Sequence, residues 1–421
     1  MKINKKILKN GVTLITVPLK DNPSATVLVM VETGSEYETR ETSGVSHFLE
    51  HMVFKGTKKR PNNMAISKEL DSLGAHYNAF TGREYTGYYA KASKKHIKKI
   101  IEIVSDMYMN PIFDEKEIEK EKGVIIEELR LNRDLPQRNV YDLNCELLYG
   151  DQPAGWKIVG REETIKSFTR EQIINYRKDH YVARSTVVIV TGDINLKQVE
   201  KDIEKAFQKL SLAPKKNKEK VVENQIAPAI KIENKKTDQT HIIISFRSMN
   251  VNDERMSTLN VLTNILSGGM SSRLFSKMRD RLGICYYINA YHDSYTDHGT
   301  LNISAGVDSK RTKEAVQGIL EECTRLKDEL ITRSELRKVK DHMIGNMALS
   351  LETSDAVADF VGDQQIFEHR VRKPEELIKK IEMVKDKDIQ ALAKEIFANE
   401  KLNFCAVGTV DESVVRSILS V

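Results

Sequence analysis

The sequence predicts an α+β fold built from two homologous domains. At 421 residues the chain is too long for one ordinary domain. Strand-sized apolar runs alternate with amphipathic helical stretches, and the same order of elements occurs in both halves. A polar, Lys-rich segment with two prolines separates the copies. We therefore expect domains at residues 1–212 and 229–421, joined by a linker at 213–228.

The individual elements follow from the hydrophobic patterns of each half. In the first half we expect a strand, a helix, a strand pair, two helices, a strand and a helix, at 26–35, 44–57, 77–80, 85–93, 94–108, 114–132, 185–194 and 195–210. The second half repeats this order at 241–250, 257–269, 286–292, 299–309, 312–326, 333–347, 402–411 and 412–419. Helices grouped in pairs, rather than alternating singly with strands, are typical of α+β domains.

Composition excludes several classes of function. Hydrophobic residues make up 40% and charged residues 30%, a globular balance, and the net charge of +5 is spread along the chain. Nucleic-acid binding needs a concentrated basic face, so we expect none. The four cysteines form no CxxC pair, which argues against a disulfide framework. No apolar run is long enough for a signal peptide or a membrane span, so we expect a cytoplasmic protein without membrane association.

The motif HFLEH, residues 47–51, carries the chemistry. On a helix, His47 and His51 lie one turn apart on the same face, where both imidazoles can bind one metal ion. Glu50 stands beside them without being a ligand, in the reversed HExxH arrangement of the inverzincins. Ser43 or Ser46 is available to cap the start of this helix. The pattern predicts a Zn²⁺ site with Glu50 as general base.

Catalytic zinc takes a third protein ligand and keeps one position for water. The segment EKEKGVIIEELR is the best source, because Glu121 and Glu128 lie two helical turns apart on one face. We take Glu128 as the ligand and Glu121 as an acidic group that supports a ligand from behind. In the second copy every candidate is replaced, by Leu259, Leu262, Thr263, Val339 and Asn346. That loss favours a role in chemistry over a role in the fold.

These residues resemble a known family, the pitrilysin-type zinc peptidases, and in particular the short branch with mitochondrial processing peptidase and its bacterial relatives. The resemblance covers nearly the whole chain, through HFLEHMVFKGT, ELDSLGAHYNAFTGREYTGYYAK, IEKEKGVIIEEL, VGREETIKSF and GGMSSRLFSKMRDRLGICY in order. Glu128 follows His51 by 77 residues, which also fits the family.

The resemblance implies a zinc endopeptidase that hydrolyses unfolded peptides or presequence-like segments. It implies two α+β halves that dimerise into a closed, clam-like chamber, and a peptide substrate bound as an added strand. Residues matching the edge-strand block are Asn78, Ala79, Phe80 and Thr81. Arg279 and Tyr286 match a pair that holds the substrate near the zinc, where they would orient the chain and stabilise the developing oxyanion.

Two departures and one alternative accompany this interpretation. The chain has PAG at 153–155 where the family often has PLG, and only SGGM at 267–270 as its glycine-rich loop. The alternative function is a catalytically silent peptide-binding or scaffold subunit, although such members tend to lose motif residues that this chain keeps. We expect a homodimer, with a heterodimer containing a silent homologue as the other possibility.

Overall fold

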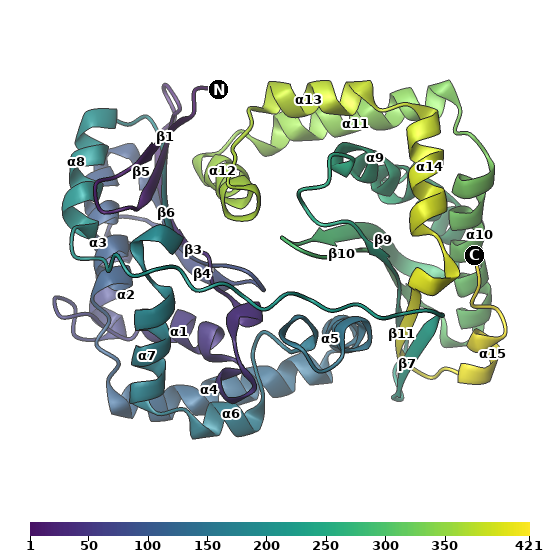
Figure 1. Cartoon of the computed structure of the whole chain (residues 1–421), viewed down its shortest axis with the longest axis horizontal. Coiled ribbons are helices and arrows are strands. Elements are labelled where there is room, and N and C mark those ends of the chain that lie inside the picture. The colour runs from purple at the N-terminus through teal and green to yellow at the C-terminus, as the bar shows by residue number, and fades with distance from the viewer. The chain divides into compact units, whose positions relative to one another are not determined.

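The duplicated order of elements produces two sheets of matching topology. The structure, a computed structural model, describes all residues from 1 to 421 (Figure 1). The first sheet has the order β1-β2-β6-β3-β5-β4. Its strands are β1 (Asn4–Ile7), β2 (Thr13–Pro18), β3 (Ser24–Val31), β4 (His76–Thr81), β5 (Thr86–Ser93) and β6 (Thr186–Gly192).

The second sheet has the order β7-β11-β8-β10-β9. Its strands are β7 (Ala229–Asn234), β8 (Thr240–Ser248), β9 (Cys285–Ser294), β10 (Gly299–Val307) and β11 (Leu402–Gly408). The pair β7 and β11 is parallel, as is the pair β2 and β6, and the other pairs are antiparallel. Five strands of the first sheet therefore have a counterpart in the second, which is the repeat seen in the sequence.

Every helix expected from the sequence forms, and others appear between them. The helices of the first half are α1 (Val45–Val53), α2 (Asn63–Ser72), α3 (Ile97–Met109), α4 (Glu115–Asp134), α5 (Pro136–Tyr149), α6 (Glu162–Ser167), α7 (Arg170–His180) and α8 (Leu196–Phe207). Those of the second half are α9 (Met256–Ser267), α10 (Thr312–Asp328), α11 (Arg333–Ser350), α12 (Ser354–Glu368), α13 (Pro374–Met383), α14 (Asp386–Ile396) and α15 (Glu412–Arg416).

The two compact units are not single stretches of chain. Unit 1 comprises Met1–Arg130, Trp156–Glu219 and Leu349–Lys373, and unit 2 comprises Leu131–Gly155, Lys220–Ala348 and Pro374–Val421. Helix α5 thus belongs with the sheet of unit 2, and α12 with the sheet of unit 1. We expected contiguous domains at 1–212 and 229–421, and the structure differs by this exchange of two helices. The repeat of strand order does not reveal the exchange, because an amphipathic pattern shows that a helix buries one face but not which sheet it covers.

Both faces of the unit 1 sheet are buried, and α12 covers one of them. Along β3, Val27 and Val29 face one hydrophobic core, whereas Leu28 and Met30 face another that includes side chains of α12. The close approach of α12 requires a glycine, because a Cβ at Gly362 would lie 2.6 Å from the Met30 sulfur. This two-sided burial explains why the sequence of β3 is continuously apolar rather than alternating.

The first part of the expected linker is fixed to unit 1. Residues up to Glu219 belong to that unit. Lys218 is almost completely buried and forms ion pairs with Glu36 at 2.6 Å and Glu84 at 2.8 Å, and Lys215 pairs with Glu32. The lysines that suggested a solvated linker therefore make specific contacts with acidic side chains.

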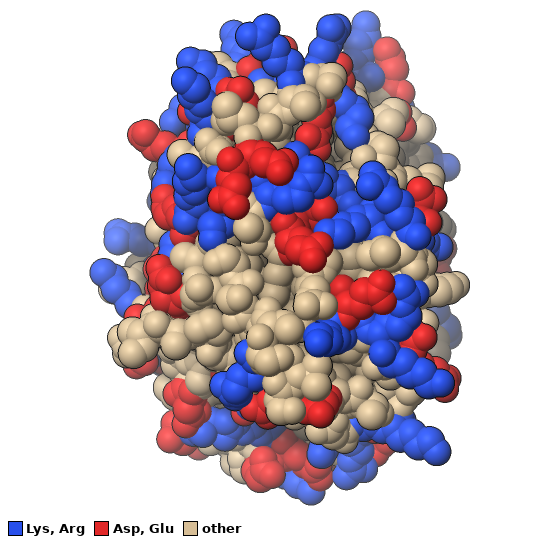
Figure 2. All heavy atoms as spheres, turned by 90° about the vertical axis from the view of Figure 1, so that its right-hand side faces the viewer, with Lys and Arg blue, Asp and Glu red and all other residues tan.

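The surface and the cysteines agree with the composition. On the face drawn in Figure 2, basic and acidic residues are interspersed around an uncharged area, so no concentrated basic patch lies on that face. The four cysteines are buried and free. None of the helices combines the length and the apolar character that crossing a bilayer requires.

Candidate metal centre

Helix α1 presents the HFLEH motif, and a buried carboxylate fixes its first turn. The backbone N–H groups of Gly44 and Ser46 donate to the Glu38 carboxylate at 2.7 and 2.8 Å. N–H groups at a helix N-terminus lack partners within the helix, and Glu38 accepts from two of them although burial raises its pKa to about 8. Our expectation that Ser43 or Ser46 caps this helix is wrong, since the helix has no side-chain cap there. No pattern in the sequence pointed to Glu38.

His47, His51 and Glu128 converge. The His47 Nε2 atom lies 3.7 Å from Glu128 Oε1, and His51 Nε2 lies 3.6 Å from Glu128 Oε2. The two imidazole rings are 4.7 Å apart, as expected for positions i and i+4 of a helix. Glu128 reaches them from α4, and one ligand atom from each residue lies within 4.8 Å of the others. The structure therefore brings together the three residues named as ligands.

This spacing fits zinc. Zinc binds nitrogen and carboxylate oxygen at about 2.0–2.2 Å, so two ligands of a tetrahedral ion stand about 3.3 Å apart. The separations of 3.6 and 3.7 Å need only small adjustments to reach that value. Two imidazoles and one carboxylate are also a donor set that suits catalytic zinc. The residues present therefore fit the ion.

The electrostatic surroundings favour a cation at this place. Burial and the neighbouring His51 lower the pKa of His47 to about 4, so its imidazole is neutral near pH 7 and able to bind a metal. Burial lowers the pKa of His51 too, but hydrogen bonds to Glu121 and Glu128 prevail and raise it to about 9. The acidic side chains thus stabilise positive charge between the histidines.

Glu121 supports His51 from the side away from Glu128. The Nδ1 atom of His51 donates to Glu121 Oε1 at 2.8 Å, which leaves Nε2 directed at the cluster. Lys55 lies 2.5 Å from the other Glu121 oxygen. Burial opposes ionisation of Glu121, but the bonds from His51 and Lys55 lower its pKa. Such a carboxylate fixes the tautomer and orientation of a ligand histidine. Sequence reasoning missed Lys55, although it lies four residues after His51.

Glu50 is adjacent to the cluster and is held in place by the sheet. The Thr81 hydroxyl donates to Glu50 Oε2 at 2.6 Å, which leaves Oε1 available. Burial raises the pKa of Glu50, opposed by the Thr81 hydrogen bond and by His51. We expected Thr81 only as a substrate-binding residue, and its contact with Glu50 was not foreseen.

Residues 78–81 lie on an open edge. Strand β4 is the last strand of its sheet and pairs only with β5, so its other side presents unpaired backbone groups. Ala79 is buried against the core beneath α1, while Asn78 is exposed. An extended peptide can add to such an edge by main-chain hydrogen bonds.

Arg279 and Tyr286 are together but lie in unit 2. Arg279 belongs to a π-helical segment, Phe275–Arg281, and donates a hydrogen bond to the backbone oxygen of Tyr286. Its guanidinium lies 5.5 Å from the centre of the Tyr286 ring, which is 71% exposed. The pair therefore belongs to unit 2, whereas His47, His51 and Glu128 belong to unit 1.

The chain matches two models of one peptidase family. Residues 15–161 match the model described as Insulinase (Peptidase family M16), and residues 167–343 match the model described as Peptidase M16 inactive domain. The first match contains His47, His51 and Glu128. The second covers most of the copy that lacks those residues.

Relatives and solved structures agree. A zinc protease of Bacillus subtilis, YmxG, is 35% identical over 94% of this chain and 96% of its own length. The mitochondrial-processing peptidase subunit beta of Neurospora crassa is 28% identical over 98% of this chain and 89% of its own. The crystal structure of a protease from Helicobacter pylori has the same fold, with a TM-score of 0.89 at 23% identity, covering 96% of this chain and 99% of that one.

Proposed function

Because this chain belongs to the M16 family of peptidases, we propose that it is a zinc-dependent endopeptidase with His47, His51 and Glu128 as ligands. The observation that carries the proposal is the convergence of these three side chains beside Glu50. The name of the Bacillus subtilis relative, a zinc protease, supports zinc as the metal.

Each residue then has a chemical task. A zinc ion held at the cluster would act as a Lewis acid on the scissile carbonyl and acidify water. Glu50 takes the proton of the attacking water and delivers it to the leaving amine, while the Thr81 hydroxyl fixes its other oxygen. Glu121 keeps His51 in the tautomer whose Nε2 faces the site.

The open edge of β4 indicates the form of the substrate. A peptide that adds to this edge must be extended, because the added strand uses its own main-chain N–H and C=O groups. Folded domains rarely offer such a segment. We therefore propose that the substrates are unfolded peptides or presequence-like segments, enclosed in a chamber during cleavage.

The test measures zinc and cleavage together. The purified chain is expected to carry about one zinc and to cut unstructured peptides at internal bonds. His47→Ala should lose both zinc and cleavage, because two remaining ligands hold the ion poorly. His96→Ala, a histidine outside the cluster, serves as the control and should retain both. Cleavage that survives the complete removal of metal would refute the proposal. A zinc-loaded chain that cuts no peptide would favour a silent peptide-binding subunit.

We further propose a two-fold homodimer in which Arg279 and Tyr286 of one copy complete the site of the other. The proposal is supported by the location of this pair outside the unit that holds the cluster, and by the name of the Neurospora crassa relative, which is a subunit.

Mixing two inactive variants tests the dimer. Glu50→Gln and Arg279→Ala chains are dissociated, mixed in equal amounts and reassembled. Random pairing makes about half of the dimers mixed, and each mixed dimer contains one intact site, so activity should recover to about a quarter of wild type. No recovery, with mixed dimers demonstrated by a mass-tagged chain, would place each site within a single chain.

A further inference from the structure

A cavity of about 430 Å³ lies between α3 and α8 of unit 1, and none of its lining residues belongs to the metal cluster. Its walls come from one face of α3, the end of α8 and the loop after α1. The volume is within the range of small-molecule sites in proteins.

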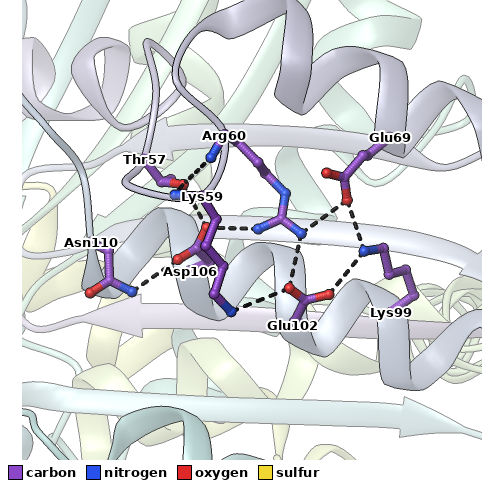
Figure 3. Close-up of polar contacts among 8 residues, drawn as sticks. All are labelled: Thr57, Lys59, Arg60, Glu69, Lys99, Glu102, Asp106 and Asn110. Carbon is purple, nitrogen blue, oxygen red and sulfur yellow. Dashed lines mark hydrogen bonds and ion pairs between the residues drawn. The ribbon is translucent and has the colours of Figure 1, made fainter.

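Two of the three carboxylates in the wall, Asp106 and Glu102, have cationic partners (Figure 3). Asp106 accepts from Arg60 at 2.7 Å and from Thr57 at 2.6 Å. Glu102 accepts from Arg60 at 3.1 Å and from Lys99 at 2.9 Å. The third, Asp202, accepts from the Gln198 amide at 2.9 Å and has no cationic partner, so one uncompensated negative charge remains in the lining.

The groups that remain available in the cavity include three cations and one buried hydroxyl donor. Lys98, Lys205 and Lys209 line it, and their exposed side chains form no ion pair in the structure. Ser105, on α3, is 3% exposed, lines the cavity, and its hydroxyl has no hydrogen-bond partner. Buried hydroxyls are normally paired, so this one indicates a missing acceptor.

Apolar side chains provide the rest of the lining. Ile101, Met109 and Ala206 lie among the polar groups. A site with a few polar groups set among apolar ones takes a ligand with a polar head and an apolar body. Three unpaired lysines, against one carboxylate without a cationic partner, favour a negatively charged head.

We propose that this cavity binds a small organic anion, with its phosphate or carboxylate group held by Lys98, Lys205, Lys209 and Ser105 and its apolar part against Ile101 and Met109. Phosphate and carboxylate share this recognition chemistry, because both offer anionic oxygens to ammonium and hydroxyl donors. The site is independent of the metal centre and of the proposed peptidase activity.

Calorimetric titration of the full-length protein with phenyl phosphate, benzoate and phenol tests the proposal. At least one of the two anions should bind, and phenol, which has the apolar ring without the charge, should not. Whichever anion binds more tightly identifies the head group. Binding of phenol as tightly as of the anions would overturn the proposal, as would the absence of binding by both anions.

Matched variants locate the binding. Lys205→Gln/Lys209→Gln should weaken it by tenfold or more, and Ser105→Ala by about tenfold, since hydrogen bonds to charged groups have that strength. The control is Lys197→Gln/Lys201→Gln, which removes the same amount of charge from α8 outside the cavity and should bind like wild type. All variants should keep wild-type peptide cleavage and melting temperature. Equal binding by both double variants would assign the anion to another place, such as the metal centre, and overturn the proposal.

Discussion

The Glu50→Gln variant is expected to keep its zinc and to lose peptide hydrolysis by about 10²–10⁴-fold, the range contributed by a general base. An amide has nearly the shape of the carboxylate and can still accept the Thr81 hydrogen bond, which is 2.6 Å long in the wild type. It cannot take a proton from water near pH 7. Zinc content by mass spectrometry and single-turnover cleavage of an unstructured peptide measure the two properties separately.

Variants of two other glutamates serve as a control and as a comparison for Glu50→Gln. Glu119→Gln changes an exposed side chain on α4 and should behave as wild type. Glu121→Gln should lose about 10–100-fold in zinc affinity or activity, because it weakens the partner that orients His51 without removing a ligand. Full activity of Glu50→Gln would remove Glu50 from the role of base. Wild-type behaviour of Glu121→Gln would make Glu121 a structural carboxylate only.

The Arg60→Met variant is expected to destabilise unit 1 by about 3–5 kcal/mol, the usual cost of leaving one partner of a buried ion pair alone. Arg60 is 3% exposed and Asp106 is 5% exposed, and the guanidinium also donates to Glu69 and Glu102 (Figure 3). Without it, Asp106 keeps Thr57 and Asn110 as donors but loses its cationic partner, since Lys59 and Lys99 pair with Glu102 instead (Figure 3).

Urea unfolding followed by the fluorescence of Trp156 measures this effect, because Trp156 is the only tryptophan of the chain and lies in unit 1. Lys59→Met is the control. Its ammonium is exposed and lies 3.5 Å from Glu102, so its loss should change stability by less than about 1 kcal/mol. In the double variant Arg60→Met/Asp106→Leu, part of the stability should return, since neither charge is then left alone. Equal stability of Arg60→Met and wild type would contradict a structural role for this network.

The sequence predicted the local part of the candidate site because helical geometry is local. The spacing of His47 and His51 is sufficient to place both rings on one face of α1, and the structure has them 4.7 Å apart. The repeat in the chain likewise predicted two sheets with corresponding strands, because each strand order is set by a similar succession of apolar segments. The sequence predicted that Glu121 supports a ligand, but it did not predict that the ligand is His51 or that the contact is made through its Nδ1 atom.

Helical spacing and the internal repeat did not predict contacts between segments that are far apart in the chain. Three contacts depend on how loops and strands pack: Glu38 with the start of α1, Thr81 with Glu50, and Lys55 with Glu121. The periodicity of the sequence does not predict such contacts. Lys215 and Lys218 lie in a segment whose composition predicted a solvated linker, but each of them forms an ion pair with an acidic side chain. Composition records how many charges a segment has, but not whether a partner lies within reach.

By itself, therefore, the sequence determined the family and the repeated α+β design, and it predicted the three residues that converge at the candidate metal site. Only the tertiary structure decided that α5 covers the sheet of unit 2 and α12 that of unit 1, and that Glu128 approaches both histidines with its two oxygens. The physical reason is that a helix pattern specifies an apolar face without specifying its partner. The partner is chosen by complementary packing between segments far apart in the chain, as where Gly362 allows α12 to approach Met30.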